Sequence, residues 1–179
     1  WKKTIGDRWE RSPQWNLEWN YYSTHVMGYH EYLQFAEDIG AIPVFCINAG
    51  ISCQLRKKYE TIPLEKMDEW VQDALDAIEY ATGSVTSKWG AVRAAAGHPK
   101  PYKMPWFEVG NENYGPDYDE RYALFYDAIK KAYPNIKIIA NENEIANVRP
   151  LNRPLEIVDE HYYKAHHWFN SNSTRYDSY

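Results

Sequence analysis

Short apolar runs alternate along this chain with stretches whose apolar residues recur at helical spacing. The clearest run, at residues 42–47, follows a turn signal at Gly40 and is apolar at every position. Such a run is typical of a parallel strand that is buried on both faces. Further strands are predicted at residues 105–110, 136–140 and 155–162. Strands that alternate with helices in this way predict an α/β fold with a parallel sheet.

Three stretches between these runs carry helical spacing, at about residues 27–39, 63–81 and 117–133. Each has one apolar face, which we expect to pack against the sheet. In the first helix this face comprises Tyr32, Leu33, Phe35, Ala36 and Ile39. In the second it comprises Met67, Trp70, Val71, Ala74, Leu75 and Ile78, and in the third Tyr122, Phe125, Tyr126 and Ile129.

The other stretches carry turn and loop signals. Asp117 and Glu120 have the spacing of a capping box, so we expect the third helix to begin at Asp117. Residues 1–25 and 84–103 show no regular period, which predicts loops. We find no internal repeat or low-complexity linker, so residues 1–179 are predicted to form one unit.

Charge and composition exclude several classes of protein. The net charge is −5 and no basic tract is present, so nucleic acid and anionic membranes are not expected as partners. No apolar run is long enough to predict a membrane-spanning helix. Cys46 and Cys53 are the two cysteines; free thiols are favoured over a disulfide, and the histidines lack ligand spacing. We therefore expect no bound metal and no cofactor.

The segment at residues 105–113 carries the candidate chemistry. Its apolar run stops at Gly110, and an amide and a carboxylate follow at Asn111 and Glu112, where a strand would end. The carboxyl ends of parallel strands hold the active site in (β/α) barrels. Glu112 is therefore the candidate catalytic residue, a general acid if apolar surroundings or a second carboxylate raise its pKa. The alternative is a solvated loop acid.

Several segments resemble a known family. The motif Trp-Phe-Glu-Val-Gly-Asn-Glu at residues 106–112 resembles the acid/base motif of retaining glycoside hydrolases built on (β/α)8 barrels. Its flanks resemble those of the family 51 α-L-arabinofuranosidases. These flanks are Trp-Lys-Lys-Thr-Ile-Gly at residues 1–6, Tyr-His-Glu-Tyr-Leu-Gln-Phe at 29–35 and Val-Asp-Glu-His-Tyr-Tyr at 158–163.

The resemblance implies a partial (β/α)8 TIM barrel. A complete barrel usually needs roughly 200–250 residues, so the 179 residues here are expected to be an incomplete catalytic domain, about strands 3 to 6, truncated at both ends. The nucleophilic glutamate would lie downstream, so the isolated chain is expected to be inactive. An open half-barrel would also expose two strand edges and an apolar inner face, which predicts instability or aggregation.

The implied activity is retaining hydrolysis that releases terminal α-L-arabinofuranosyl residues from plant polysaccharides or oligosaccharides. The expected partner is therefore an arabinose-containing saccharide, and the full-length protein could form homo-oligomers. A secreted or cell-envelope location is favoured over the cytoplasm. Two alternatives stay open: another retaining (β/α)8 glycosidase, such as a β-xylosidase or an endoglucanase, and an inactive sugar-binding fragment.

The resemblance also suggests residues that contact the sugar. Trp19 follows Trp1 at the interval of a pocket tryptophan in the family, and the chain's 8 Trp and 16 Tyr suit the apolar faces of sugars, although packing explains most of them. Asn48 ends a predicted strand and either binds a hydroxyl or caps the turn. The remaining candidates are Asn111, His161 and Tyr163.

His161 and Tyr163 lie two residues apart and so share one face of an extended strand. The resemblance implies that the tyrosine holds the absent nucleophile by a hydrogen bond. The alternative is a core histidine beside a rim aromatic. Glu142 and Glu144 follow a neighbouring predicted strand, and we expect neither to be a second catalytic carboxylate.

Overall fold

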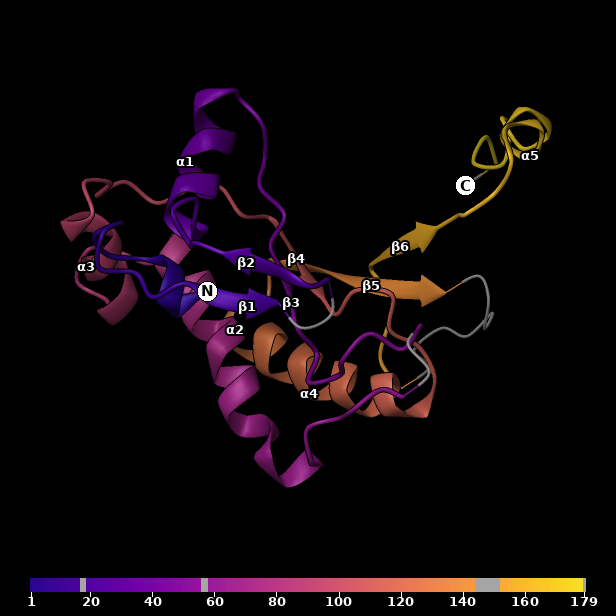
Figure 1. Ribbon diagram of the computed structural model, residues 1–179, viewed down its shortest axis with the longest axis horizontal. Helices are drawn as coiled ribbons and strands as arrows, with labels where there is room; N and C mark the ends of the chain where they lie inside the picture. The colour runs from indigo at the N-terminus through magenta and orange to yellow at the C-terminus, as the bar shows by residue number, and fades with distance from the viewer. Residues whose placement is uncertain (17–18, 56–57, 144–151, 179) are drawn as a thin grey trace.

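Four parallel strands form the main sheet of the protein in a computed structural model. The structure describes residues 1–16, 19–55, 58–143 and 152–178, and for residues 142 and 143 it describes only the backbone. The strands are β3 (Cys46–Ile47), β4 (Trp106–Val109), β5 (Lys137–Asn143) and β6 (Ile157–His161), and they lie side by side in chain order (Figure 1). Each neighbouring pair is parallel. The predicted α/β fold with a parallel sheet is therefore confirmed.

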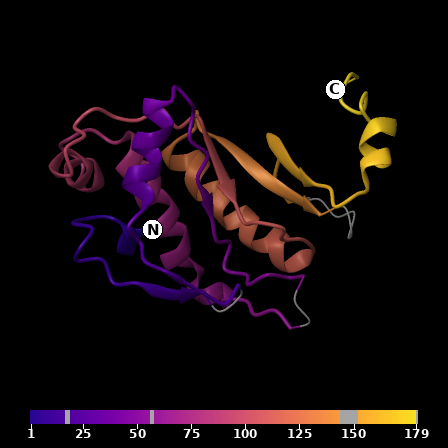
Figure 2. The same cartoon turned by 45° about the horizontal axis from the view of Figure 1, so that its top comes forward.

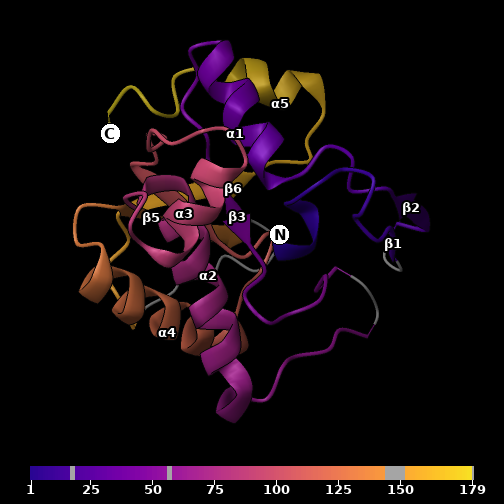
Figure 3. The same cartoon turned by 90° about the vertical axis from the view of Figure 1, so that its left-hand side faces the viewer.

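Helices α2 and α4 pack side by side and lie below the strands in the view of Figure 1 (Figures 1 and 3). The helices are α1 (Tyr29–Asp38), α2 (Met67–Thr82), α3 (Lys88–Ala95), α4 (Pro116–Ala132) and α5 (His166–Ser171), with 3-10 turns η1 (Lys2–Thr4) and η2 (Leu64–Lys66). The helix α5 lies beyond the carboxyl end of β6 and apart from the others (Figures 1 and 2).

The hydrophobic core lies between the sheet and these two helices. Alternation along the strands points Phe107, Val109, Ile138 and Ala140 toward the helices, and all four are fully buried. The helices contribute the buried residues Met67, Ala74, Ile78, Tyr122, Phe125 and Ile129. Trp70, Val71, Leu75 and Tyr126 are partly buried against the same core. The apolar faces predicted for α2 and α4 are therefore confirmed.

The face predicted for α1 is wrong. Tyr32, Phe35 and Ile39 are 58%, 53% and 62% exposed, and of the predicted face only Leu33 is buried. The helix instead turns Tyr29 and His30 inward, where polar contacts with α2 hold them: the Tyr29 hydroxyl donates to Ala77 O (2.9 Å), and His30 Nδ1 lies 2.8 Å from the Tyr80 hydroxyl.

The strand predicted at residues 42–47 is only Cys46–Ile47, and Ile42 and Val44 are 43% and 47% exposed. In the described part of the chain β3 is the edge strand and pairs only with β4, so the predicted burial on both faces does not occur. The residues before β3 and the exposed side of α1 line an apolar groove of about 530 Å³.

We expect the isolated chain to self-associate through this groove and the unpaired edge. Replacing Phe35 by Glu and Ile39, the C-cap residue of α1, by Lys puts two opposite charges at i, i+4 spacing in this groove. The doubly substituted chain should be markedly more soluble, as measured by light scattering after size exclusion. Leu124→Lys, at an exposed apolar residue on α4, is the control and should change little. A parent chain that is monomeric and unfolds reversibly would contradict the expectation.

The predicted N-terminal loop contains an antiparallel hairpin, β1 (Gln14–Asn16) and β2 (Tyr21–Ser23), in addition to η1. Contacts distant in sequence hold this region. The Trp1 indole donates to Asp73 O (3.1 Å), and the Arg11 guanidinium pairs with Glu31 (2.7 Å) at the start of α1. These long-range contacts, which leave no periodic signal, are why the sequence indicated a loop.

The second predicted loop, residues 84–103, contains α3. The Ser87 side chain caps this helix by accepting from Gly90 N (3.2 Å). Arg93 in its last turn is fully buried and donates to backbone carbonyls at the end of α2 and in the loop after α3. These acceptors are His98 O, Tyr80 O, Ala81 O, Gly83 O and Pro99 O. Helix α3 is short and is held in place mainly by the buried Arg93, so its apolar residues show only a weak helical period. For this reason the sequence predicted a loop instead of a helix here.

The predicted capping box at Asp117 is also wrong. Helix α4 begins at Pro116, and its N-cap is Gly115, whose φ of 79° suits glycine. Asp117 therefore lies inside the first turn, and its carboxylate accepts from the Tyr59 hydroxyl (3.0 Å) instead of capping. Proline at the first helical position sets the start one residue earlier than the acid spacing suggested.

Candidate functional site

The loop between β4 and α4 presents Glu112 at the carboxyl end of the sheet. Three residues in this loop have positive φ: Gly110 (80°), Glu112 (54°) and the N-cap Gly115 (79°). A side chain at Gly110 would lie 2.7 Å from Asn113 Oδ1, so glycine is required for both its conformation and its space. A non-glycine residue rarely adopts positive φ, and such strain is often found at functional sites.

Two side chains from the end of β6 hold the Glu112 carboxylate. Glu112 Oε1 accepts from the Tyr163 hydroxyl (2.5 Å) and lies 2.9 Å from His161 Nδ1. The other ring nitrogen, His161 Nε2, lies 2.7 Å from Asp159 Oδ2. The structure therefore brings Glu112, His161 and Tyr163 together, as expected for a shared pocket. Only 13% of the Glu112 side chain is exposed, so Glu112 is not a freely solvated loop acid.

These contacts set the charges of the site. The hydrogen bond from Tyr163 lowers the pKa of Glu112, partial burial opposes this, and His161 lowers the pKa further. Burial alone would lower the pKa of His161, but its hydrogen bonds to Glu112 and Asp159 outweigh burial and raise it. An imidazolium between two carboxylates donates from both nitrogens. In this state Glu112 is an ionised base, and the raised pKa of a general acid is not present.

Removing the Tyr163 hydroxyl should raise the pKa of Glu112. The variant Tyr163→Phe removes the largest contribution that stabilises the carboxylate, so its protonation shifts to higher pH. A ¹³C NMR titration of the glutamate side chains in the chain of residues 1–179, made soluble by Phe35→Glu and Ile39→Lys, measures this shift. Tyr176→Phe, on a tyrosine that binds Glu160 instead, is the control. An unchanged titration of Glu112 in Tyr163→Phe would show that the hydrogen bond does not form in solution.

Buried amides hold the loop that carries Glu112. The Asn113 side chain accepts from Asn111 N (3.2 Å) and donates to Gln54 Oε1 (3.3 Å). Gln54 also accepts from Tyr114 N and donates to Tyr114 O. Asn141 on β5 accepts from Asn113 N (3.4 Å). These buried amides are paired with one another, which fixes a single conformation of the loop.

Four further residues belong to this site and were not predicted from the sequence: Glu108, Asn113, Asn141 and Asp159. Glu108 Oε1 accepts from Asn141 Nδ2 (3.2 Å), and its carboxyl group hydrogen-bonds Asp159. Burial and then Asp159 raise the pKa of Glu108 to about 8. One signal in the sequence was available: Glu108 is an acid inside an apolar strand, on the opposite face from Phe107 and Val109.

The other predicted sugar contacts lie on separate elements. Asn48 follows β3, and its Oδ1 accepts from Gly50 N (2.7 Å), so its oxygen caps the turn, which was the alternative reading of this residue. Asn111 is exposed beside Glu112. Trp19 is 65% exposed and belongs to the β1–β2 hairpin, which stands to one side of the main sheet (Figure 3).

Several further expectations concern groups outside this site. The backbone of Glu142 lies in β5, but its side chain and all of Glu144 lie outside the described residues. Cys46 and Cys53 are free thiols, and Cys46 Sγ donates to Gly110 O (2.9 Å). Where side chains are described, no three His, Cys, Asp or Glu residues are grouped as metal ligands. None of the described helices is long and apolar enough to cross a membrane.

Acidic and amide side chains at the carboxyl ends of parallel strands are characteristic of the active sites of α/β enzymes. Residues 1–179 match the model of the α-L-arabinofuranosidase 1 domain. The chain is 41% identical to an extracellular exo-α-L-arabinofuranosidase of Streptomyces chartreusis and 40% identical to α-L-arabinofuranosidase 2 of Arabidopsis thaliana, over 100% and 91% of its residues. The chain therefore belongs to the α-L-arabinofuranosidase 1 domain family.

Solved structures agree with this membership. An arabinose-bound family 51 α-L-arabinofuranosidase superposes on the whole chain with a TM-score of 0.89 and 31% identity. The arabinose complex of the Thermotoga maritima enzyme covers 98% of the chain with a TM-score of 0.75 and 26% identity. The chain spans 28% and 36% of these two proteins, and 22% and 23% of the Streptomyces and Arabidopsis relatives.

Proposed function

We propose that this chain is part of the catalytic barrel of a retaining α-L-arabinofuranosidase, with Glu112 as the general acid/base. The observation that carries the proposal is that His161 and Tyr163 both contact the Glu112 carboxylate at the carboxyl end of the parallel sheet. In this reading β3 to β6 are strands 3 to 6 of a (β/α)8 barrel, residues 1–179 are an incomplete domain, and the nucleophilic glutamate lies outside the chain.

The proposed reaction has two displacements. In the first, Glu112 gives its proton to the glycosidic oxygen as the bond to the anomeric carbon breaks, and the nucleophilic carboxylate bonds to that carbon. In the second, ionised Glu112 takes a proton from water, whose oxygen bonds to the anomeric carbon and releases the nucleophile. Retention requires the two carboxyl groups to be about 5–5.5 Å apart.

Tyr163 explains how one carboxyl group could serve both steps. Its hydroxyl keeps Glu112 ionised in the present structure. In the complete site we infer that the hydroxyl donates to the nucleophile instead. Glu112 would then lose its strongest hydrogen bond and lie near a second negative charge, and both changes raise its pKa toward that of a general acid.

The proposed sugar contacts follow from where the side chains lie. Asn111, next to Glu112, is proposed to hydrogen-bond the 2-hydroxyl, a contact that strengthens in the transition state of glycosidases. Asn48 has an amide nitrogen to offer at the end of β3, and the exposed Trp19 ring offers a flat apolar surface. Arabinose-containing oligosaccharides or polysaccharides are the proposed substrates. A secreted protein is proposed because a relative is named extracellular.

The deciding experiment assays the full-length protein on aryl α-L-arabinofuranoside beside aryl β-xyloside and aryl β-glucoside. Cleavage of the arabinoside, with a first-formed sugar of retained configuration by NMR, supports the proposal. Cleavage of only the β-pyranosides would place the activity in another retaining glycosidase class. A folded protein that binds arabinosides without cleaving them would favour a binding role.

A further inference from the structure

The face of the sheet opposite the core carries an acid that the proposed mechanism does not use. Glu108 lies in β4 two residues before Gly110, in register with Cys46 of β3 and Ile139 of β5. Its carboxyl group accepts from Asn141 Nδ2 (3.2 Å) and hydrogen-bonds Asp159. Two carboxyl groups in contact repel when both are ionised, so such a pair retains one proton between them.

Asp159 links this pair to the catalytic candidate. Its Oδ2 lies 2.7 Å from His161 Nε2, and His161 Nδ1 lies 2.9 Å from Glu112 Oε1. The contacts therefore run in one line from Glu108 through Asp159 and His161 to Glu112. If Glu108 carries the proton, its carboxyl group donates to Asp159, which then contacts both Glu108 and the imidazole of His161.

We propose that Glu108 is a positioning residue that acts as a neutral hydrogen-bond donor to Asp159 and, through Asp159 and His161, orients Glu112. The inference rests on the proposed function, because it assigns Glu108 a task in the same site. A second carboxylate at Glu108 would repel Asp159 and draw the imidazole away from Glu112. A neutral donor avoids this cost.

Burial and Asp159 outweigh the groups that favour a charged Glu108. Asp159 and His161 face it from β6 and Cys46 from β3, Asn141 on β5 donates to it, and the Tyr118 hydroxyl of α4 lies within electrostatic range. Burial disfavours the carboxylate most and Asp159 adds to this, while His161 and the hydrogen bond from Asn141 partly oppose it, so the pKa is raised to about 8. Glu108 is then protonated at neutral pH and ionises above about pH 8.

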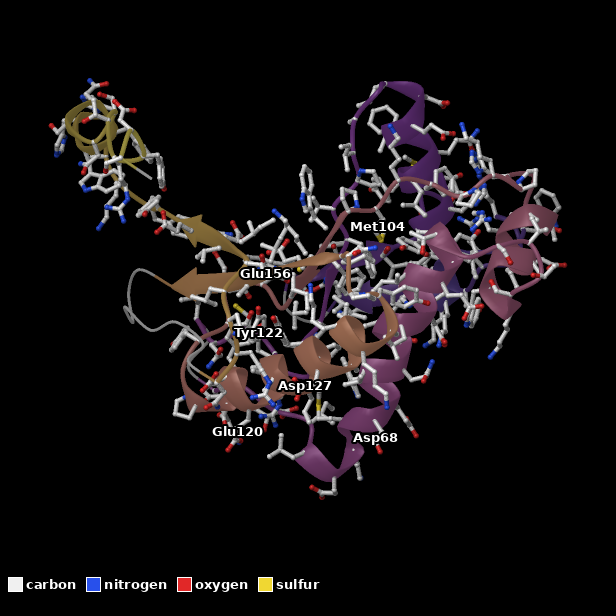
Figure 4. All side chains as sticks on the ribbon, turned by 180° about the vertical axis from the view of Figure 1, so that it is seen from behind. Asp68, Met104, Glu120, Tyr122, Asp127 and Glu156 are labelled. Carbon is white, nitrogen blue, oxygen red and sulfur yellow. The ribbon has the colours of Figure 1, made fainter. Side chains whose placement is uncertain are left out.

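The test compares three variants of the full-length enzyme on an aryl α-L-arabinofuranoside. Glu108→Gln keeps a neutral donor, so its kcat/KM should stay within about threefold of the parent value at pH 6. Glu108→Leu removes the donor at similar volume and should lower kcat by about tenfold or more with little change in KM, because catalytic groups tolerate little misplacement. Glu120→Gln, on the outer side of α4, is the matched control (Figure 4).

The pH profile separates positioning from structural support. The parent should lose activity as Glu108 ionises around pH 8, and Glu108→Gln should lack that limb. Equal loss in Glu108→Gln and Glu108→Leu would overturn the proposal, because it would show that a carboxylate is needed.

A readout without activity keeps the inference distinct from the proposed function. Infrared spectra of ¹³C-glutamate-labelled protein should show a protonated carboxyl band at neutral pH that disappears in Glu108→Gln. If that band is present but the parent cleaves no arabinofuranoside, the proposed function fails and the neutral donor stands. Spectra in which Glu108 is ionised at neutral pH would overturn the inference even in an active enzyme.

Discussion

Replacing Glu112 with Gln should lower kcat/KM on natural arabinosides by roughly 10²–10⁴, the range in which general acid–base help contributes. Glutamine keeps the size of the side chain and can still accept from Tyr163 and His161. The loop should therefore stay in place, and the loss should report the missing proton transfer. Steady-state kinetics on the full-length enzyme measure it, with Glu120→Gln as the control for a glutamate away from the site.

The dependence on the leaving group sharpens this test. A dinitrophenyl leaving group departs without a proton, so the first displacement in Glu112→Gln should be nearly as fast as in the parent, whereas a sugar leaving group should be strongly affected. In Glu112→Ala, azide can attack the glycosyl-enzyme without a general base, so it should restore turnover and yield arabinosyl azide. A variant equally slow on both leaving groups and not rescued by azide would exclude Glu112 as the acid/base.

The sequence predicted those parts of the site that depend only on residues close together in the chain. The apolar run that stops at Gly110, followed by Asn111 and Glu112, predicted both a strand and an acid at its carboxyl end. Two-residue alternation likewise predicted that His161 and Tyr163 share a face. The role of Glu108 could not be predicted in this way, because its state depends on Asp159, which only the pairing of β5 with β6 brings near.

Burial was harder to predict than secondary structure. Helix α1 has two overlapping apolar faces, and the sequence alone does not say which of them meets a partner. The pairing of Tyr29 and His30 with α2 turns Tyr32 and Phe35 outward. In the same way, Val44 is a residue type that is common in buried strands, but whether it is buried depends on whether another strand lies beside β3. Interfaces of this kind depend on the neighbouring elements.

The largest stability loss is expected at Arg93, which the sequence did not single out. Its guanidinium is fully buried and donates to carbonyls of Tyr80, Ala81 and Gly83 at the end of α2, and to the loop beyond α3. Arg93→Met keeps much of the volume but leaves these carbonyls unsatisfied. Since each unsatisfied buried acceptor costs about 1–3 kcal/mol, we expect a loss of about 3–5 kcal/mol after partial relaxation.

The Arg93 prediction has an internal comparison. Thermal unfolding of the full-length protein should therefore begin at a clearly lower temperature in Arg93→Met than in the parent. Lys131→Met makes the same kind of change at an exposed site on α4 and should stay within about 0.5 kcal/mol. The unfolding temperature of Arg93→Lys should lie between those of the other two variants. A single ammonium group cannot reach all the carbonyl oxygens that the planar guanidinium group contacts. If Arg93→Met unfolds at the same temperature as Lys131→Met, solvent reaches those carbonyls and the cation does not join α2 to α3.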